Sequence, residues 1–177
     1  MPQYLAFLRA INLGAKRKFP KADIVAATEA AGMTDVETHI NTGNVFFTST
    51  LRSPAKVRAA LEKAYATDRG FDVPAIVFTP EEIRAITERG TQLRAVNEDG
   101  ARHYVQLFHE PPPQGAVAAA QALGLPGEEL VVEGRAAYAL MPEVAGSRLT
   151  NSKEYAALGQ GTARTITVLQ AIVEKWC

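Results

Sequence analysis

The first ninety residues alternate between short apolar runs and longer segments with helical periodicity. Continuous or alternating apolar positions predict strands, and apolar positions three or four apart predict the helices between them. The predicted elements are a strand over 3–11, a helix over 20–31, a β-hairpin over 36–48, a helix from Ser53-Pro54 to about Gly70, and a strand over 73–78. This β-α-β-β-α-β order is that of the split βαβ, or ferredoxin-like, unit, in which four antiparallel strands carry two helices on one face.

A helix start and a polar segment follow this unit. Thr79 and Glu82 form a capping box around Pro80, which predicts a further short helix ending near Arg89. Residues 91–101 are polar, lack periodicity and contain Asn97-Glu98-Asp99-Gly100, so they predict a linker. The predicted organisation is therefore a ferredoxin-like α+β subdomain over 1–90, a linker over 91–101 and a second α+β subdomain over 102–177.

The second half opens with the same kinds of elements as the first, without a matching sequence repeat. The predicted elements are a strand over 102–109 that stops at three prolines, an alanine-rich helix to about Leu123, strands over 130–132 and 136–141 joined by a turn at 133–135, a short helix over 152–158 and a final helix whose apolar stripe runs from Ile166 to Trp176. The predicted order is βαββαα, smaller than the first half. The expected fold class is α+β.

Composition and charge limit the classes of protein to which the chain can belong. The 177 residues are 47% hydrophobic and 21% charged, as in globular proteins. The only cysteine is Cys177, which excludes an intramolecular disulfide and favours a reducing, cytoplasmic location. The N-terminal apolar run is too short for a signal peptide or a membrane span, so no membrane partner is expected. Nineteen basic and nineteen acidic residues cancel, so any binding of nucleic acid has to be local.

Three motifs carry a resemblance that spans nearly the whole chain. They are Phe7-Leu8-Arg9-Ala10-Ile11-Asn12-Leu13-Gly14, then residues 34–47 with His39-Ile40-Asn41-Thr42-Gly43-Asn44-Val45 at their centre, and Ser147-Arg148-Leu149-Thr150-Asn151. The sequence resembles the bacterial family called domain of unknown function 1697.

Members of that family typically read Leu-Arg-Gly-Ile-Asn-Val-Gly, Tyr-Ile-Gln-Ser-Gly-Asn-Val and Ser-Lys-Leu-Thr-Asn at these places. This chain has Ala10 for the glycine, His39 for the tyrosine, Asn41-Thr42 for glutamine-serine and Arg148 for the lysine. It also lacks the tryptophan that usually precedes the last helix. The resemblance implies an uncharacterised protein of bacterial type and supplies no catalytic residues.

The first candidate site is the segment from Arg9 to Lys21. It contains five basic residues and no acidic one, and Asn12 and Gly14 turn the backbone where the strand ends. Together with the N-terminus of the following helix, these side chains, Lys18 among them, suit an anion. The alternative is a solvated basic loop in which Arg9 pairs with a carboxylate, since charge runs usually face water.

Two further polar motifs are candidates. The turn containing Gly43 and Asn44 offers amide and hydroxyl groups to a ligand, although turn geometry alone explains the same residues. The segment containing Arg148, Thr150 and Asn151 is also explained by helix capping.

The leading hypothesis combines these motifs: the chain binds a small phosphate- or carboxylate-bearing ligand in a cleft between the halves, as an enzyme or as a binding protein. The predicted ligand-binding residues are Arg9, Asn12, Gly14, Lys18, Gly43, Asn44, Arg148, Thr150 and Asn151. A nucleic-acid-binding module that uses the loop 9–21 and a protein-interaction domain are the alternatives. The three histidines lack the spacing of metal ligands, so no metal and no cofactor is expected, and the sequence does not indicate an oligomeric state.

Overall fold

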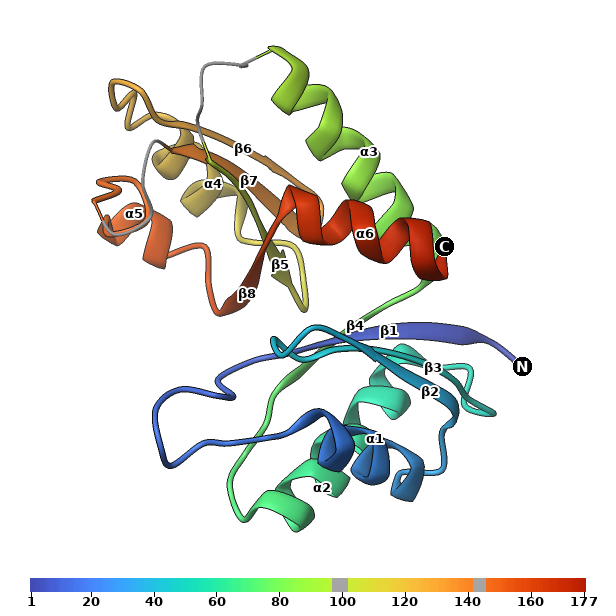
Figure 1. Cartoon of the computed structure of the whole chain (residues 1–177). Helices are drawn as coiled ribbons and strands as arrows, with labels where there is room; N and C mark the ends of the chain where they lie inside the picture. Colours follow the sequence, from blue (N-terminus) through green and yellow to red (C-terminus); the bar gives the residue numbers. More distant parts are fainter. Residues whose placement is uncertain (97–101, 142–145) are drawn as a thin grey trace. The chain divides into compact units, whose positions relative to one another are not determined.

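The chain folds into two compact units, each built on a four-stranded antiparallel sheet. The structure is a computed structural model that describes residues 1–96, 102–141 and 146–177 (Figure 1). One unit contains Met1–Ile83 with Trp176–Cys177, and the other contains Arg84–Lys175. Both units alternate strands and helices, which confirms the α+β class. The predicted limits of the halves as folding domains stay a prediction.

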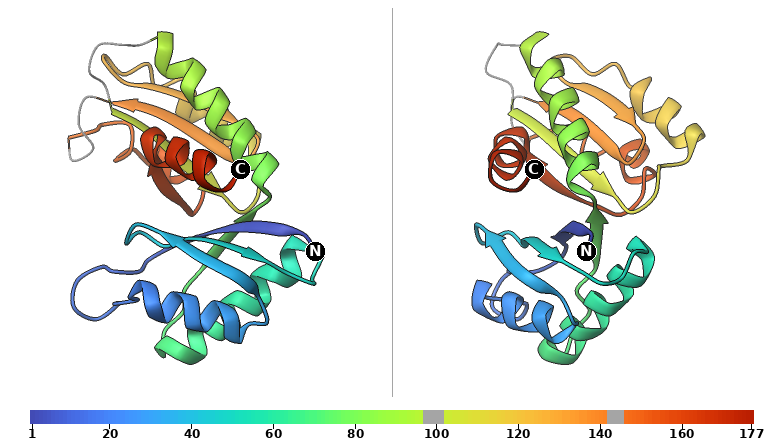
Figure 2. Two further views of the ribbon diagram at one scale, coloured as in Figure 1. Left: turned by 45° about the vertical axis from the view of Figure 1, so that its right-hand side comes forward. Right: turned by 90° about the vertical axis from the view of Figure 1, so that its right-hand side faces the viewer.

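The first unit has the predicted order of elements. They are β1 (Gln3–Leu8), α1 (Lys21–Ala30), β2 (Thr34–His39), β3 (Asn44–Thr48), α2 (Pro54–Arg69) and β4 (Ala75–Phe78). The strands lie in the order β2-β3-β1-β4, and every neighbouring pair is antiparallel. Helices α1 and α2 lie together on one face of this sheet (Figure 1 and Figure 2). Between them and the sheet lies the core, which includes Phe19, Phe47, Leu61 and Tyr65.

The strand β1 is shorter than the sequence predicts. Its pairing ends at Leu8, and Ala10 and Asn12 have φ values of +56° and +55°. These left-handed conformations cannot continue a strand, so the chain leaves the sheet three residues before the predicted end at residue 11. The apolar side chain of Ile11 is nevertheless buried, which explains why the apolar run extends past the strand.

The second unit is built from the rest of the chain. Its elements are α3 (Pro80–Val96), whose first residues belong to the first unit, β5 (Arg102–Phe108), α4 (Gln114–Gln121), β6 (Glu129–Glu133), β7 (Ala136–Met141), α5 (Lys153–Ala156), β8 (Gly161–Thr165) and α6 (Ile166–Trp176). The strands lie in the order β6-β7-β5-β8. Residues Ala137 and Ala139 of β7 pack toward α4 and α5. The intervening Tyr138 reaches α3, where its hydroxyl donates to the Ile86 carbonyl at 3.2 Å.

The predicted order βαββαα is wrong at β8, which the sequence analysis missed. This strand pairs with β5 from Thr165 opposite Tyr104 to Gly161 opposite Phe108. Its inward positions are Thr162 and Arg164, so no apolar alternation marks it. With β8 included, β5 to β8 and the helices between them repeat the element order and the strand order of the first unit, with α3 before them and α6 after them.

The predicted end of the third helix near Arg89 is also wrong. Helix α3 continues to Val96, so the first six residues of the predicted linker, 91–96, are helical, and 97–101 lie outside the described residues. Glycine has a low helix propensity, so Gly90 indicates a helix end in the sequence. In the structure, Gly90 lies inside the helix at a packing contact. A Cβ at this position would lie 2.6 Å from Cδ1 of Ile166, so a larger residue would require the Ile166 side chain to move.

In each unit, the turn between the second and third strands folds over the end of the first. The Leu8 amide donates to the Gly43 carbonyl at 2.8 Å, and the Phe108 amide donates to the Arg135 carbonyl at 2.9 Å. Gly43 has φ +75°, and a Cβ there would lie 2.7 Å from Cβ of Leu8 and 2.8 Å from Cδ1 of Ile11. Close approach of two backbones therefore requires glycine at position 43.

A pair of glycine substitutions tests this packing. We expect Gly43→Ala to lower the free energy of unfolding by about 2–4 kcal/mol, since it combines a left-handed conformation with overpacking. Gly14→Ala, at φ +65° with no atom within 4 Å of the added methyl group, should cost only the conformational part, about 1–2 kcal/mol. Urea denaturation measures both values. Equal losses in the two variants would show that Gly43 does not pack as described.

Candidate functional site

The basic loop, residues 9–21, is an ordered structure attached to the β2–β3 turn. Its tip closes through a 2.6 Å hydrogen bond from the Asn12 amide to the Arg17 carbonyl. The Asn12 side chain makes two more bonds: Oδ1 accepts from the Phe19 amide at 3.0 Å, and Nδ2 donates to the Asn41 carbonyl at 2.9 Å. One side-chain amide thus holds both ends of the loop and links it to the turn.

Arg17 supports the loop without being neutralised. Its guanidinium donates to the carbonyls of Ala10 and Asp72, each at 2.6 Å, and lies 4.5 Å from the centre of the Phe71 ring. All three partners are neutral groups. The side chain therefore fixes the loop against the segment that precedes β4 while keeping its positive charge in place.

Carboxylates on the neighbouring helices are paired with another arginine. Arg69 lies 3.0 Å from Asp23 of α1 and 2.7 Å from Asp68 of α2, and it also donates to the Lys18 carbonyl. In the part of the chain that the structure describes, Lys16 and Lys18 have no carboxylate within 4 Å. The two lysines at the tip of the basic loop therefore form no ion pair with the described residues.

The structure brings six of the nine predicted ligand-binding residues to one end of the first unit. They lie at the C-terminal end of β1 and in the adjoining turn: Arg9, Asn12, Gly14, Lys18, Gly43 and Asn44. Three of the six are explained by the fold. Asn12 and Gly43 are described above, and the buried Asn44 donates to the His39 carbonyl at 3.0 Å and to the Thr42 hydroxyl at 2.9 Å, which closes the turn.

The other three predicted residues belong to the second unit, where a carboxylate holds their backbone. The Glu128 side chain accepts from the amides of Arg148 at 2.9 Å and Leu149 at 2.6 Å. The Asn151 side chain donates to the Ser147 carbonyl at 2.7 Å, and the Thr150 amide donates to the Ser147 hydroxyl at 3.0 Å. Glu128 was not singled out from the sequence, because nothing local links it to a motif twenty residues later. Convergence of this segment with the basic loop stays a prediction.

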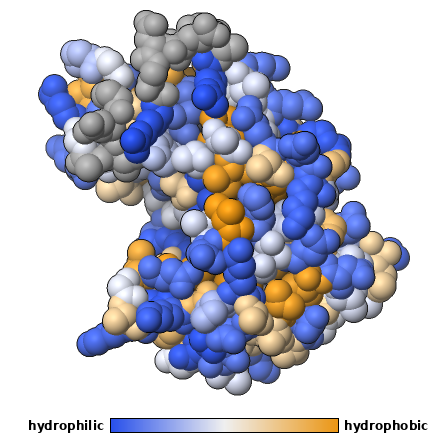
Figure 3. Space-filling view, in the orientation of Figure 1, coloured by the Kyte–Doolittle hydropathy of each residue, from blue (hydrophilic) through white to orange (hydrophobic). Residues whose placement is uncertain are grey.

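Two exposed aliphatic side chains flank the bond between the loop and the turn. Leu13 is 63% exposed and Ile40 is 38% exposed; apart from Met1, they are the exposed large hydrophobic residues of the described chain. Ile40 also has φ +52°, a conformation that is rare for a β-branched residue. In Figure 3, hydrophobic and hydrophilic surface are interspersed on the left side of the lower half, where the loop projects in Figure 1. The hairpin predicted over 36–48 includes Ile40 as a strand residue, and no pattern in the sequence indicates that Leu13 is exposed.

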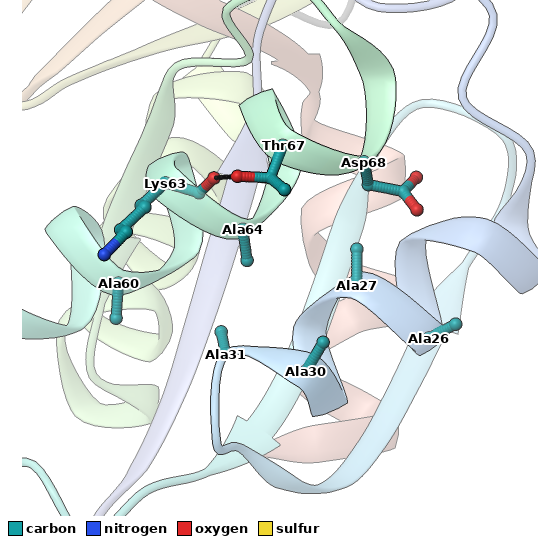
Figure 4. Close-up of a pocket in the computed structure, with 9 residues that line it drawn as sticks. All are labelled: Ala26, Ala27, Ala30, Ala31, Ala60, Lys63, Ala64, Thr67 and Asp68. Carbon is teal, nitrogen blue, oxygen red and sulfur yellow. Dashed lines mark hydrogen bonds between the residues drawn. The ribbon is translucent and has the colours of Figure 1, made fainter.

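A groove between α1 and α2 lies elsewhere in the first unit. It encloses about 710 Å³ and is lined by alanines of both helices, with Lys63, Thr67 and Asp68 at the α2 side (Figure 4). Thr67 turns its hydroxyl back to the Lys63 carbonyl at 2.8 Å. The groove holds no convergent set of polar groups among the described residues that line it, so it offers little specific chemistry.

The buried titratable side chains of the second unit include His103, Tyr155 and Arg164. His103 is buried, and neither ring nitrogen has a hydrogen-bond partner among the described residues; burial, together with the charge of Arg94, lowers its pKa. Burial raises the pKa of Tyr155 to about 12, and its hydroxyl donates to the Gln106 side chain at 2.6 Å. Burial also lowers the pKa of Arg164 to about 10. Among residues 1–96, 102–141 and 146–177, no three His, Cys, Asp or Glu side chains are grouped as metal ligands.

The same described ranges contain no helix with both the length and the apolar character that a membrane crossing needs.

Comparison with known proteins agrees with the motifs. The chain shares its fold with a conserved bacterial protein, SP0830 from Streptococcus pneumoniae, with a TM-score of 0.74 and 23% sequence identity over 98% of this chain and 97% of that one. No curated protein matches the sequence. A family model described as protein of unknown function (DUF1697) matches residues 1–138. Because the match covers most of the chain and contains the first two motifs, this protein belongs to the DUF1697 family.

Proposed function

We propose that the protein binds a small phosphate- or carboxylate-bearing ligand at the tip of the basic loop. The observation that carries this proposal is the pairing pattern of the charges. Arg17 is bonded only to neutral groups in the described chain, while Arg69 takes up the carboxylates of the adjacent helices. Lys16 and Lys18 are thus left to attract an anion.

The hydrogen bonds that hold the basic loop favour a ligand-binding site over the alternative of a solvated basic loop. A lysine on a mobile loop loses side-chain and backbone freedom when it binds, which reduces affinity. Here Asn12 and Arg17 fix the backbone around Lys16 through bonds to four carbonyl and amide groups of the chain. Helix α1 begins directly after the loop, and its N-terminus has no capping side chain, which adds positive potential at the same end.

The fold does not indicate the function, so the function has to be inferred from the site. Element order and strand order support a ferredoxin-like assignment for the first unit and, with β8 included, for the second as well. This architecture hosts many unrelated activities, so it does not favour one chemistry over another. The proposal therefore depends on the charges and their geometry, and whether a reaction follows binding is a separate question.

A charge-removal experiment tests the proposal. We expect pyrophosphate to bind the wild-type protein in isothermal titration calorimetry at low salt. The double variant Lys16→Ala, Lys18→Ala should bind it about 10-fold or more weakly, since exposed charged contacts contribute on the order of 1 kcal/mol each.

The matched control is Lys56→Ala. Lys56 is an exposed lysine in the first turn of α2, about 20 Å along the helix from Arg69, which contacts the basic loop. An equal loss of affinity in the control and the double variant would contradict a local site. Binding of a single-stranded oligonucleotide with a steep salt dependence, without binding of pyrophosphate, would favour the nucleic-acid alternative instead.

A separate variant tests the predicted participation of the second unit. If Arg148 contacts the same ligand as the basic loop, Arg148→Ala should weaken pyrophosphate binding about 5- to 10-fold and leave the Glu128 bonds to the backbone intact, because these involve amides and not the Arg148 side chain. Calorimetry gives the affinity, and thermal unfolding without ligand gives the control for stability. Unchanged affinity would restrict the site to the first unit.

A further inference from the structure

The backbone at Ile40 has a left-handed conformation that is costly for this type of residue. A φ of +52° disfavours any residue with a Cβ, and most strongly one that is branched there. Asparagine or glycine would adopt it with less strain. The strain is not offset by complete burial, because 38% of the Ile40 side chain is exposed. Backbone strain at a partly exposed residue is a reason to look for a functional role.

Leu13 lies on the other side of the bond between the basic loop and the β2–β3 turn, and its exposure also calls for an explanation. It stands at the tip of the basic loop and is 63% exposed, so it contributes little to the core. The Asn12 side chain bonds to the Asn41 carbonyl at 2.9 Å, which brings the residues next to Leu13 and Ile40 together. Two exposed aliphatic residues are thus held on neighbouring backbone segments beside the lysines of the loop.

From this juxtaposition we propose that the ligand carries an apolar group near its anionic group. The inference rests on the proposed function and narrows its ligand class. Lys16 and Lys18 bind the phosphate or carboxylate, and Leu13 and Ile40 cover the adjoining apolar part. Inorganic phosphate satisfies only the first half of this surface. An alkyl phosphate satisfies both, because its chain is attached at the phosphate. A nucleoside monophosphate satisfies both at a longer spacing, because the ribose separates the phosphate from the apolar face of the base.

Three phosphates with similar charge separate the two halves of the surface. Inorganic phosphate, hexyl phosphate and adenosine monophosphate are titrated into the wild-type protein at one pH and low salt. We expect at least one of the two organic phosphates to bind about 10-fold more tightly than inorganic phosphate, the lower end of the gain from burying one aliphatic side chain. Which of them gains identifies the apolar group as an alkyl chain or a heterocycle. If neither gains, the inference is wrong.

Removal of one aliphatic side chain tests its role directly. In Leu13→Ser, the advantage of the organic phosphate should fall to 3-fold or less, while affinity for inorganic phosphate stays within 2-fold of wild type. Loss of both affinities to the same extent would overturn the inference, since Leu13 would then only shape the loop. The proposed function fails in a different way: no phosphate binds, or the double lysine variant binds all three as the wild type does.

Ile40→Asn separates binding from folding. Asparagine tolerates the left-handed conformation, so the melting temperature of the protein without ligand should rise by about 2–4 °C. The same variant should lose most of the preference for the organic phosphate. A lower melting temperature would overturn the inference, because Ile40 would then be needed for the fold. Lys56→Ala again serves as the control, with unchanged preference and unchanged melting temperature.

Discussion

The side-chain amide of Asn12 is the contact on which the candidate site depends. It accepts a hydrogen bond from the Phe19 amide and donates one to the Asn41 carbonyl, so that three segments of the first unit are fixed by one residue. Without these bonds, the basic loop would be a flexible chain of like charges that repel one another. With them, the backbone segments that carry the lysines and the exposed aliphatic side chains are held at the end of the sheet. The chemistry of the site follows from this constraint.

Backbone strain collects in the same region. Of the four non-glycine residues with positive φ in the described chain, Ala10, Asn12 and Ile40 lie in the loop or the adjoining turn. Ala10 stands where members of the DUF1697 family typically have glycine, and its φ of +56° gives a physical reason for that glycine. Asn12 tolerates the conformation through its short polar side chain, whereas Ile40 does not. The fold therefore carries a conformational cost at the end of the first unit where the positive charge also gathers.

Much of the fold could be predicted from local sequence patterns. The capping signals of α2, the continuous apolar run of β3 and the proline stop after β5 each predicted an element that the structure contains. Strand β8 was missed because its inward side chains are Thr162 and Arg164, and a buried arginine does not look like a core position. The end of α3 was misjudged because Gly90 reads as a helix terminator, whereas its real role is close packing against Ile166. For the site, the sequence located the basic loop, but exposure of Leu13 and the strain at Ile40 are three-dimensional facts.

The central claim is that a small anion binds at the tip of the basic loop, and amide chemical shifts test it most directly. In a titration of the isotope-labelled protein with hexyl phosphate, the largest shifts should fall on residues 12–18 and 40–43, with a single saturable affinity. The amides around Glu128 in the second unit report whether that segment responds as well. Shifts spread evenly over the surface, or concentrated at the groove between α1 and α2, would contradict the account.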